Sequence, residues 1–259
     1  KKLGMNNTAL GFKAGFTGQF IEDELHKEGI QTQFVNVDGI TRINVFTQVV
    51  STSEEFKLVN QGPSVSQLQE EALLKIIENM NMEDFLFVSG SHPEGITYTT
   101  YEKIAKAAQL RGFKLILDTS ADFVPDLLKY RPYLIKPNDE ELAEWFGLIN
   151  PSLEEIKDCG QKLLEKGAEN VLVSLGEKGA ILFTPTETIH VTAPKGEVVN
   201  TACAGDTLLA TFVGSQLLGL SDEQALIKAV AAGSSTAFRP GLTDFSDVPT
   251  LMQQIKRIS

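Results

Sequence analysis

Residues 200–206 (NTACAGD) combine small side chains with one carboxylate and lead into the apolar run 207–218, which predicts a helix that begins here. The first-turn amides of a helix have no intrahelical acceptor and lie at the positive end of its dipole, so they can bind an anion. Asp206 could take a proton from an attacking hydroxyl while the amides stabilise phosphoryl charge. That chemistry suits ATP-dependent phosphoryl transfer, although an Asp in this setting is, taken alone, usually a plain N-cap.

Three further loops place polar residues directly after strand-like segments. Residues 89–95 (SGSHPEG), 136–141 (KPNDEE) and 174–179 (SLGEKG) each follow a short apolar run. Ligands of open α/β sheets bind at the carboxyl ends of strands, so these loops are candidates for substrate and nucleotide contacts. The hydroxyls and amides of the first loop could hold a sugar or a phosphate, but an ordinary βα loop is an equal alternative.

The two later loops offer ligands for phosphate and magnesium. Asn138 and Glu141, three residues apart at an expected helix start, could orient magnesium-bound water and phosphate oxygens. Gly176 and Gly179 would let the backbone approach a polyphosphate, while Ser174 offers a hydroxyl. An Asn cap and a hairpin turn are the plainer interpretations. The glycine spacing matches neither a Walker A loop nor a dinucleotide fingerprint.

Arg42 is the natural guanidinium for a substrate phosphate. It lies in the strand-like run 42–50, which is otherwise apolar or neutral. The alternative is an exposed arginine on a lid. The three histidines have no metal-site spacing, and no motif supports a Ser/His/Asp triad.

Composition limits the partners and the compartment. The formal charge of −11 over 259 residues argues against non-specific nucleic-acid binding. Two cysteines make no disulfide framework, and no apolar stretch approaches the length of a membrane span. No signal peptide is visible. We therefore expect a cytoplasmic protein that binds neither nucleic acid nor membrane.

Helix and strand signals alternate along the chain. This alternation predicts a parallel sheet covered on both faces by helices. We expect one domain over residues 1–259, with the strand-rich segment at about 31–62 acting as a β lid. Expected helices lie at 17–29, 67–80, 99–110, 140–146 and 153–166, with three more near the C-terminus, and expected strands at 33–37, 42–50, 56–59, 85–88, 113–117, 133–135, 171–174, 180–184 and 188–191.

The order of four motifs, GSHPEG, KPNDEE, SLGEKG and NTACAGDT, resembles the ribokinase-like PfkB carbohydrate kinases. Within that family the chain is similar to the branch of 1-phosphofructokinase and tagatose-6-phosphate kinase, and most to the former. Residues 15–18 (GFTG), 41–45 (TRINV), 117–120 (LDTS) and 231–238 (AAGSSTAF) add to the likeness, which covers the whole chain. The resemblance implies a three-layer αβα sandwich with a mostly parallel sheet and a small β lid.

The resemblance also implies roles for individual residues. Asp206 matches the family's catalytic base, and Cys203, Ala204 and Gly205 match its anion hole. Residues that match the family's ATP-binding positions are Ser174, Gly176, Gly179 and Asn138. Glu141 matches a position that contacts magnesium indirectly. Arg42 and Ser91 match positions that bind the substrate. A homodimer through the lid is implied as well.

The implied activity is transfer of a phosphoryl group from magnesium-bound ATP to fructose 1-phosphate, giving fructose 1,6-bisphosphate. Tagatose 6-phosphate as substrate is the nearest alternative, and a catalytically weakened protein that only binds sugar phosphate or nucleotide is another. Two departures from the family motivate the alternative of a protein that only binds its ligands. An N-terminal strand–loop–helix of roughly 40 residues is expected before Lys1, and Cys203 stands where the family has glycine.

Cys203 raises two specific expectations. A Cβ at a position that needs positive φ costs on the order of 1–2 kcal/mol. A cysteine at a helix N-terminus can have a lowered pKa, and its thiolate would repel ATP. The alternative is a backbone that tolerates any small residue.

Overall fold

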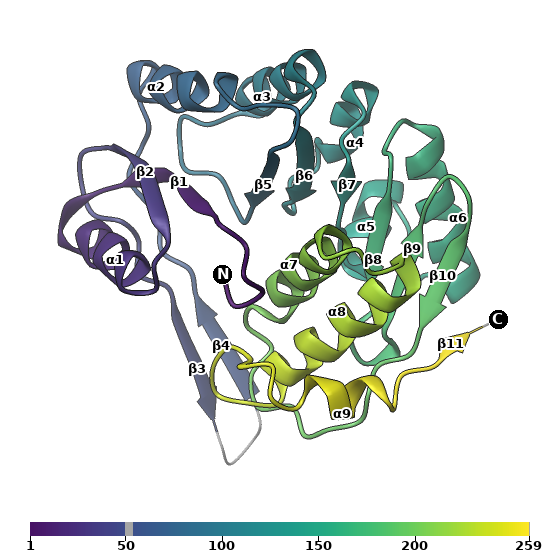
Figure 1. Ribbon diagram of the computed structural model, residues 1–259. Helices are drawn as coiled ribbons and strands as arrows, with labels where there is room; N and C mark the ends of the chain where they lie inside the picture. The colour runs from purple at the N-terminus through teal and green to yellow at the C-terminus, as the bar shows by residue number, and fades with distance from the viewer. Residues whose placement is uncertain (50–53, 259) are drawn as a thin grey trace. The chain divides into compact units, whose positions relative to one another are not determined.

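The expected alternation of strands and helices is present in the computed structural model, which describes residues 1–49 and 54–258 (Figure 1). The contacts divide the chain into two compact units. The first comprises Lys1, Leu3–Met80 and His92–Ala107, and the second comprises Lys2, Asn81–Ser91 and Ala108–Ser259. Each unit is described by itself.

The first unit contains a parallel pair of strands and an antiparallel hairpin. β1 (Thr8–Lys13) and β2 (Gln31–Asn36) are parallel and are connected by α1 (Gly15–Lys27). β3 (Val45–Val49) and β4 (Glu54–Leu58) form the hairpin, and α2 (Gln67–Glu78) follows. α3 (Tyr98–Arg111) begins in this unit and ends in the second.

Two details differ from the expected lid at 31–62. β2 pairs with β1, which the sequence patterns did not predict, so the hairpin itself spans only β3 and β4. Arg42 precedes β3 and lies in a loop, because the strand begins at Val45. Residue 50, the last of that expected strand, lies outside the described residues.

The second unit is built on a seven-stranded sheet in the order β11-β10-β9-β8-β7-β6-β5. β5 to β8 run parallel, whereas β8 to β11 pair antiparallel. The strands are β5 (Phe85–Ser89), β6 (Lys114–Asp118), β7 (Leu134–Ile135), β8 (Val171–Ser174), β9 (Ala180–Phe183), β10 (Thr188–Val191) and β11 (Arg257–Ile258).

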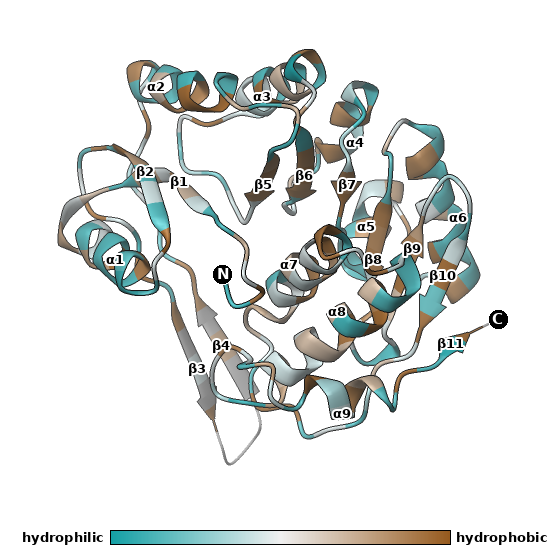
Figure 2. Cartoon of the chain, viewed as in Figure 1, coloured by the Kyte–Doolittle hydropathy of each residue, from teal (hydrophilic) through white to brown (hydrophobic). Residues whose placement is uncertain are grey.

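Helices cover this sheet on both faces. They are α4 (Val124–Leu127), α5 (Asp139–Phe146), α6 (Leu153–Glu165), α7 (Ala204–Leu217), α8 (Asp222–Ala237) and α9 (Val248–Met252), with short 3-10 turns at Leu128–Tyr130 and Gly176–Lys178. The middle strands are coloured hydrophobic along their length in Figure 2, as expected for strands buried on both faces, whereas α6 alternates between polar and apolar residues.

Alternate residues of each strand point to opposite faces, which explains how the two layers of helices pack. Leu172 and Leu182 belong to the cluster that includes α7, α8 and α9. Phe183, the neighbour of Leu182, faces α6 instead, where a Cβ added to Gly160 would lie 2.4 Å from its ring. Gly160 therefore allows α6 to approach the sheet closely.

Among the described residues, no helix combines the length and the apolarity needed to cross a bilayer.

His190 makes the stability of the second unit sensitive to acid. Its side chain is buried on β10, and burial together with the positive charge of Lys157 lowers its pKa below the usual value of 6.5. The unfolded chain then binds the proton more tightly, so the free energy of unfolding decreases as the pH falls below about 6.5.

We expect His190→Leu to weaken this acid dependence. Between pH 7.5 and 5.5, urea denaturation should show a loss of unfolding free energy that is smaller in the variant than in the wild type by about 1 kcal/mol. An identical pH dependence in the two proteins would contradict the assignment.

Candidate active site

The carboxyl ends of β5, β6, β7 and β8 bring the candidate loops of the second unit together at one edge of the sheet. Ser89, the last residue of β5, pairs with Asp118, and the Gly90 amide donates to the Asp118 carbonyl at 2.9 Å. Asn138 forms a parallel bridge with Ser174, whose amide donates to the Pro137 carbonyl at 3.1 Å. Backbone hydrogen bonds thus fix these loops relative to one another.

α7 begins as the sequence predicts, immediately after the NTAC segment. Cys203 precedes the helix with φ 62°, in the left-handed region, and its carbonyl accepts from the Thr207 amide at 2.9 Å. The Ala204 amide donates to the Thr201 carbonyl at 3.3 Å. The amides of Gly205 and Asp206 belong to the first turn, where no intrahelical acceptor exists, and the Asp206 side chain is exposed.

α8 holds this end of α7 in place. A Cβ added to Gly233 of α8 would lie 3.0 Å from the Ala204 carbonyl oxygen and 3.2 Å from the Leu208 Cβ. The hydroxyl of Thr236 donates to that of Thr207 at 3.1 Å. Small residues in the 231–238 segment therefore allow two helices to pack closely beside the first turn of α7.

Asp118 and Lys136 form an ion pair at the ends of β6 and β7, with 3.0 Å between Lys136 Nζ and Asp118 Oδ1. Burial raises the pKa of Asp118 and Lys136 lowers it, while the charges of Asp206 and Glu141 raise it further. Three carboxylates thus interact at this edge. Neither residue was predicted from the sequence to have a role, although a charged residue at the end of an apolar strand is a signal that could have identified both.

Asn138 and Glu141 form a capping box at the start of α5. The Glu141 amide donates to Asn138 Oδ1 at 2.7 Å, and the Asn138 amide donates to Glu141 Oε2 at 2.9 Å. The interpretation of Asn138 as a helix cap is therefore correct. It does not compete with ligand binding, because these two bonds use only one oxygen of the Glu141 carboxylate.

The loop from Ser174 to Gly179 connects antiparallel strands, so the hairpin interpretation is also correct. The Leu175 amide donates to the Gly179 carbonyl at 2.9 Å. Gly179 has φ 100°, and a Cβ there would lie 1.9 Å from the Val191 carbonyl oxygen, so only glycine fits. Gly176 has φ 56° and nothing within 4 Å of an added Cβ, which leaves its surroundings open.

The two substrate candidates lie in different units. Ser91 is exposed, two residues beyond β5, in the second unit. Arg42 is half-buried in the first unit, and both side chains have interacting partners.

The thiol of Cys203 behaves differently from the sequence-based expectation. Partial burial, the charge of Asp206 and a hydrogen bond to that carboxylate all raise its pKa. The expected lowering of the pKa is wrong, because burial of the thiol and the nearby carboxylate of Asp206 both favour the neutral form. A neutral thiol adds no negative charge to an anion site. The other expectation, a Cβ at positive φ, is confirmed.

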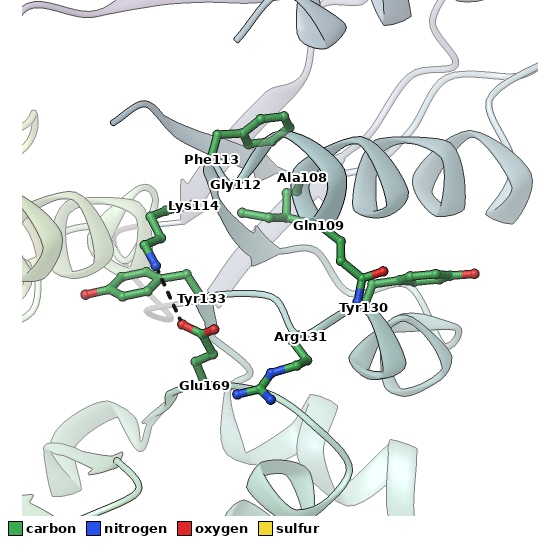
Figure 3. Close-up of a pocket in the computed structure, with 10 residues that line it drawn as sticks. Ala108, Gln109, Gly112, Phe113, Lys114, Tyr130, Arg131, Tyr133 and Glu169 are labelled. Carbon is green, nitrogen blue, oxygen red and sulfur yellow. Dashed lines mark ion pairs between the residues drawn. The ribbon is translucent and has the colours of Figure 1, made fainter. Parts of the chain in front are cut away.

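A pocket of about 170 Å³ lies away from these residues, at the amino ends of β6 and β8 (Figure 3). Lys114 and Glu169 form an ion pair on its wall, with 3.9 Å between Nζ and Oε2, and the Lys114 ammonium lies 5.4 Å from the centre of the Tyr133 ring. None of the candidate site residues lines it.

The chain is similar to carbohydrate kinases over nearly its whole length. A sequence profile of the pfkB family carbohydrate kinases matches residues 1–250. D-tagatose-1-phosphate kinase from Bacillus licheniformis is 49% identical over 257 residues, covering 99% of this chain and 84% of the relative. 1-Phosphofructokinase from Bacillus subtilis is 37% identical over 256 residues, again covering 99% and 84%.

A solved structure agrees with the sequence comparisons. Phosphofructokinase-2 from Escherichia coli in complex with potassium superimposes with a TM-score of 0.90 at 25% identity, covering 97% of this chain and 83% of the other. The expectation of a ribokinase-like α/β fold, with a large and mostly parallel sheet flanked by helices, is confirmed.

The left-handed backbone at Cys203 can be tested by substitution. Cys203→Gly should raise the free energy of unfolding by about 0.5–1 kcal/mol, because it relieves the Cβ clash but increases the entropy of the unfolded chain. Cys203→Ala keeps the Cβ and should show no such gain. Urea denaturation of both variants provides the measurement, and a glycine variant no more stable than the alanine variant would contradict the assignment.

Proposed function

This chain belongs to the pfkB family of carbohydrate kinases, and we propose that it transfers the γ-phosphoryl group of ATP to a ketohexose 1-phosphate. The substrate that we propose is fructose 1-phosphate, and the product is fructose 1,6-bisphosphate. The observation that carries the proposal is the exposed carboxylate of Asp206 in the first turn of α7, beside amides that lack helical partners.

Asp206 acts as the general base. It accepts the proton of the attacking sugar hydroxyl as that oxygen bonds to the γ-phosphorus and the bond to ADP breaks. The amide of Gly205, in the 203–205 segment, stabilises the charge on the transferred group. The Ala204 amide in the same segment already donates to the Thr201 carbonyl. Little covalent chemistry falls to the protein, so positioning and electrostatic stabilisation supply most of the rate.

ATP is held by the two loops that the Asn138–Ser174 bridge ties together. Ser174 and Asn138 offer polar side chains, and the open surroundings of Gly176 allow a phosphate to approach the backbone. Gly179 contributes by keeping the loop in its conformation.

Magnesium fits these residues as a partner of the nucleotide. The described residues hold no group of three or more His, Cys, Asp or Glu side chains that would bind a metal alone. Mg²⁺ commonly binds through one or two carboxylates together with substrate phosphates and water. Glu141, whose capping bond uses Oε2, could hold such a water through Oε1. The ion would neutralise phosphate charge.

Arg42 and Ser91 are assigned to the sugar phosphate. The guanidinium would grip the phosphate on C1, and the Ser91 hydroxyl would bind the sugar. These two assignments rest on the family resemblance.

The relatives bear on which sugar is used. Both are named for substrates that carry the phosphate on C1, which favours a ketohexose 1-phosphate over the alternative tagatose 6-phosphate. D-tagatose 1-phosphate is a second candidate, because the relative at 49% identity is named for it. The location we propose is the cytoplasm, consistent with Cys159 and Cys203 both being free.

A homodimer through the β3–β4 hairpin is part of the proposal. Exposed apolar side chains gather on the hairpin and its flanks: Ile43, Val45, Phe56, Leu58 and Val59. Clusters of this kind favour an interface with a second copy of the chain.

Asp206→Asn tests the proposed base. The variant should lose at least about 1,000-fold in kcat while its Kd for ATP changes little, because the amide cannot accept the proton. Turnover is followed as ADP release that depends on sugar phosphate. Asp222→Asn, a first-turn substitution on α8 that keeps an acceptor for the Gln216 amide, is the matched control and should stay active.

Two outcomes would contradict the proposal. Near-wild-type turnover in Asp206→Asn would show that Asp206 is not the general base. Wild-type protein that is thermally stabilised by sugar phosphate and ATP, yet releases no ADP, would support the alternative of a protein that only binds its ligands.

Leu58→Glu tests the dimer. A charge on the exposed face of β4 should shift the protein to a monomer at about 1 μM in analytical ultracentrifugation, because burying an unpaired carboxylate opposes association. Leu110→Glu is the control, since Leu110 is also exposed but lies on α3. A Leu58→Glu protein that remains dimeric would contradict an interface through the hairpin.

A further inference from the structure

The pocket at the amino ends of β6 and β8 combines two cations with tyrosine rings. Lys114 is the first residue of β6, and Arg131 lies in the loop before β7. Figure 3 shows Lys114, Tyr133 and Glu169 on one side of the pocket and Tyr130 on the other, with Arg131 between them. All the lining residues belong to the second unit. The pocket therefore lies within one unit, at the end of the strands opposite to the candidate active site.

The backbone of Arg131 is in the left-handed region, with φ 57° and ψ 59°. Its amide donates to the Leu128 carbonyl at 2.9 Å, so Arg131 ends the short 3-10 turn at a position where glycine is the usual residue. A side chain is disfavoured in this conformation, because its Cβ approaches the following carbonyl oxygen. Strain of this kind is concentrated at functional sites. The chain thus keeps a guanidinium where glycine would be the less strained residue.

Arg131 is also a cation without a compensating carboxylate. Within the part of the chain that the structure describes, its guanidinium forms no ion pair, whereas Lys114 Nζ lies 3.9 Å from Glu169 Oε2. That separation is too long for a hydrogen bond, so the ammonium donors of Lys114 remain for a ligand. Two cations and one carboxylate leave a single net positive charge. The pocket is therefore suited to a monoanion.

The size and the walls of the pocket define the rest of the ligand. An apolar cavity of about 150 Å³ can hold benzene, so the 170 Å³ of this pocket accommodates a body of that size with one small polar group. The rings of Tyr130 and Tyr133 offer apolar contacts. The fork of a guanidinium matches the two oxygens of a carboxylate. A phosphate monoester carries more negative charge than the pocket balances.

Tyr133 connects this pocket with α7. Its hydroxyl donates to Gln216 Oε1 at 3.1 Å, and the Gln216 side-chain amide donates to Asp222 Oδ1 at 2.8 Å. Gln216 lies in the last turn of α7, and Asp206 lies in the first. Small shifts of whole helices are a common form of conformational change. A ligand that displaces the Tyr133 ring can therefore displace the first turn of α7.

We propose that this pocket binds a small organic monocarboxylate and that its occupancy regulates the active site through Tyr133 and α7. Arg131 binds the carboxylate, Lys114 adds a second cation, and the tyrosine rings contact the body of the ligand. Binding at the pocket is independent of the proposed function. Regulation rests on the proposed function, because it acts on the ATP site at the first turn of α7.

Benzoate is the probe for binding, and benzamide is its neutral counterpart of the same shape. In a ligand-observed NMR titration of the full chain, benzoate should bind with a Kd of about 1 mM or lower. Benzamide should bind at least about tenfold more weakly, because it offers no charge to the guanidinium. Equal binding of the two compounds, or no binding of benzoate, would overturn the proposal.

Arg131→Gly separates ligand binding from a structural role. The change removes the guanidinium and relieves the left-handed Cβ, so the melting temperature should stay the same or rise while the Kd for benzoate increases at least about tenfold. Asn150→Gly is the matched control, because Asn150 is also left-handed, with φ 50°, but lies outside the pocket. It should bind benzoate as the wild type does. Unchanged benzoate binding in Arg131→Gly would overturn the proposal.

Tyr133→Phe tests regulation, since it keeps the ring but removes the hydroxyl that reaches Gln216. In the wild type, saturating benzoate should change the Kd for ATP in calorimetry by at least about fivefold, and ATP should change the Kd for benzoate by the same factor. The variant should bind both ligands with this mutual effect reduced to less than about twofold. Benzoate that binds the wild type without altering the Kd for ATP would overturn regulation.

The proposed function and this inference fail separately. Wild-type protein that releases no ADP in the absence of benzoate would overturn the proposed function, while benzoate binding can still be measured. Wild-type protein that phosphorylates its sugar substrate but binds no benzoate would overturn the inference alone.

Discussion

Parallel pairing of β5 to β8 is the constraint on which the candidate site depends. Parallel strands end at the same edge, and their hydrogen bonds place Asp118, Lys136 and Ser174 at consecutive strand ends. The helices between them must then cover the faces of the sheet, which leaves the edge open to ligands. Chemistry at this edge therefore follows from the topology before any single side chain is considered.

Charge balance is the second constraint. The first turn of α7 attracts an anion, but Asp206, Glu141 and Asp118 oppose one. A nucleotide with bound magnesium brings positive charge with its phosphates, and Lys136 supplies a further cation from within the protein. The raised pKa of Cys203 fits the same balance, because a neutral thiol avoids a fourth negative charge beside Asp206.

Much of this arrangement could be predicted from the sequence. The apolar run after residue 206 predicts α7, and the Asn-x-x-Glu spacing predicts the capping box of α5, since both signals are local. β1 was not predicted, because α1 separates it in the sequence from its partner β2 and because polar and apolar residues alternate only weakly along it. The contact of Lys136 with Gly205 joins segments about 70 residues apart in the chain, so no local pattern could reveal it. The pKa of Cys203 was misjudged because its direction depends on burial of the thiol and on the carboxylate of Asp206, neither of which a local pattern shows.

The chemical identity of the product tests the central claim most directly. Full-length protein is incubated with ATP, magnesium and fructose 1-phosphate, and the phosphorus resonances are followed by NMR. The account predicts one equivalent of ADP for each new phosphate ester on C6, with the ester on C1 retained. ADP formation without a bisphosphate, or no consumption of ATP at all, would contradict it.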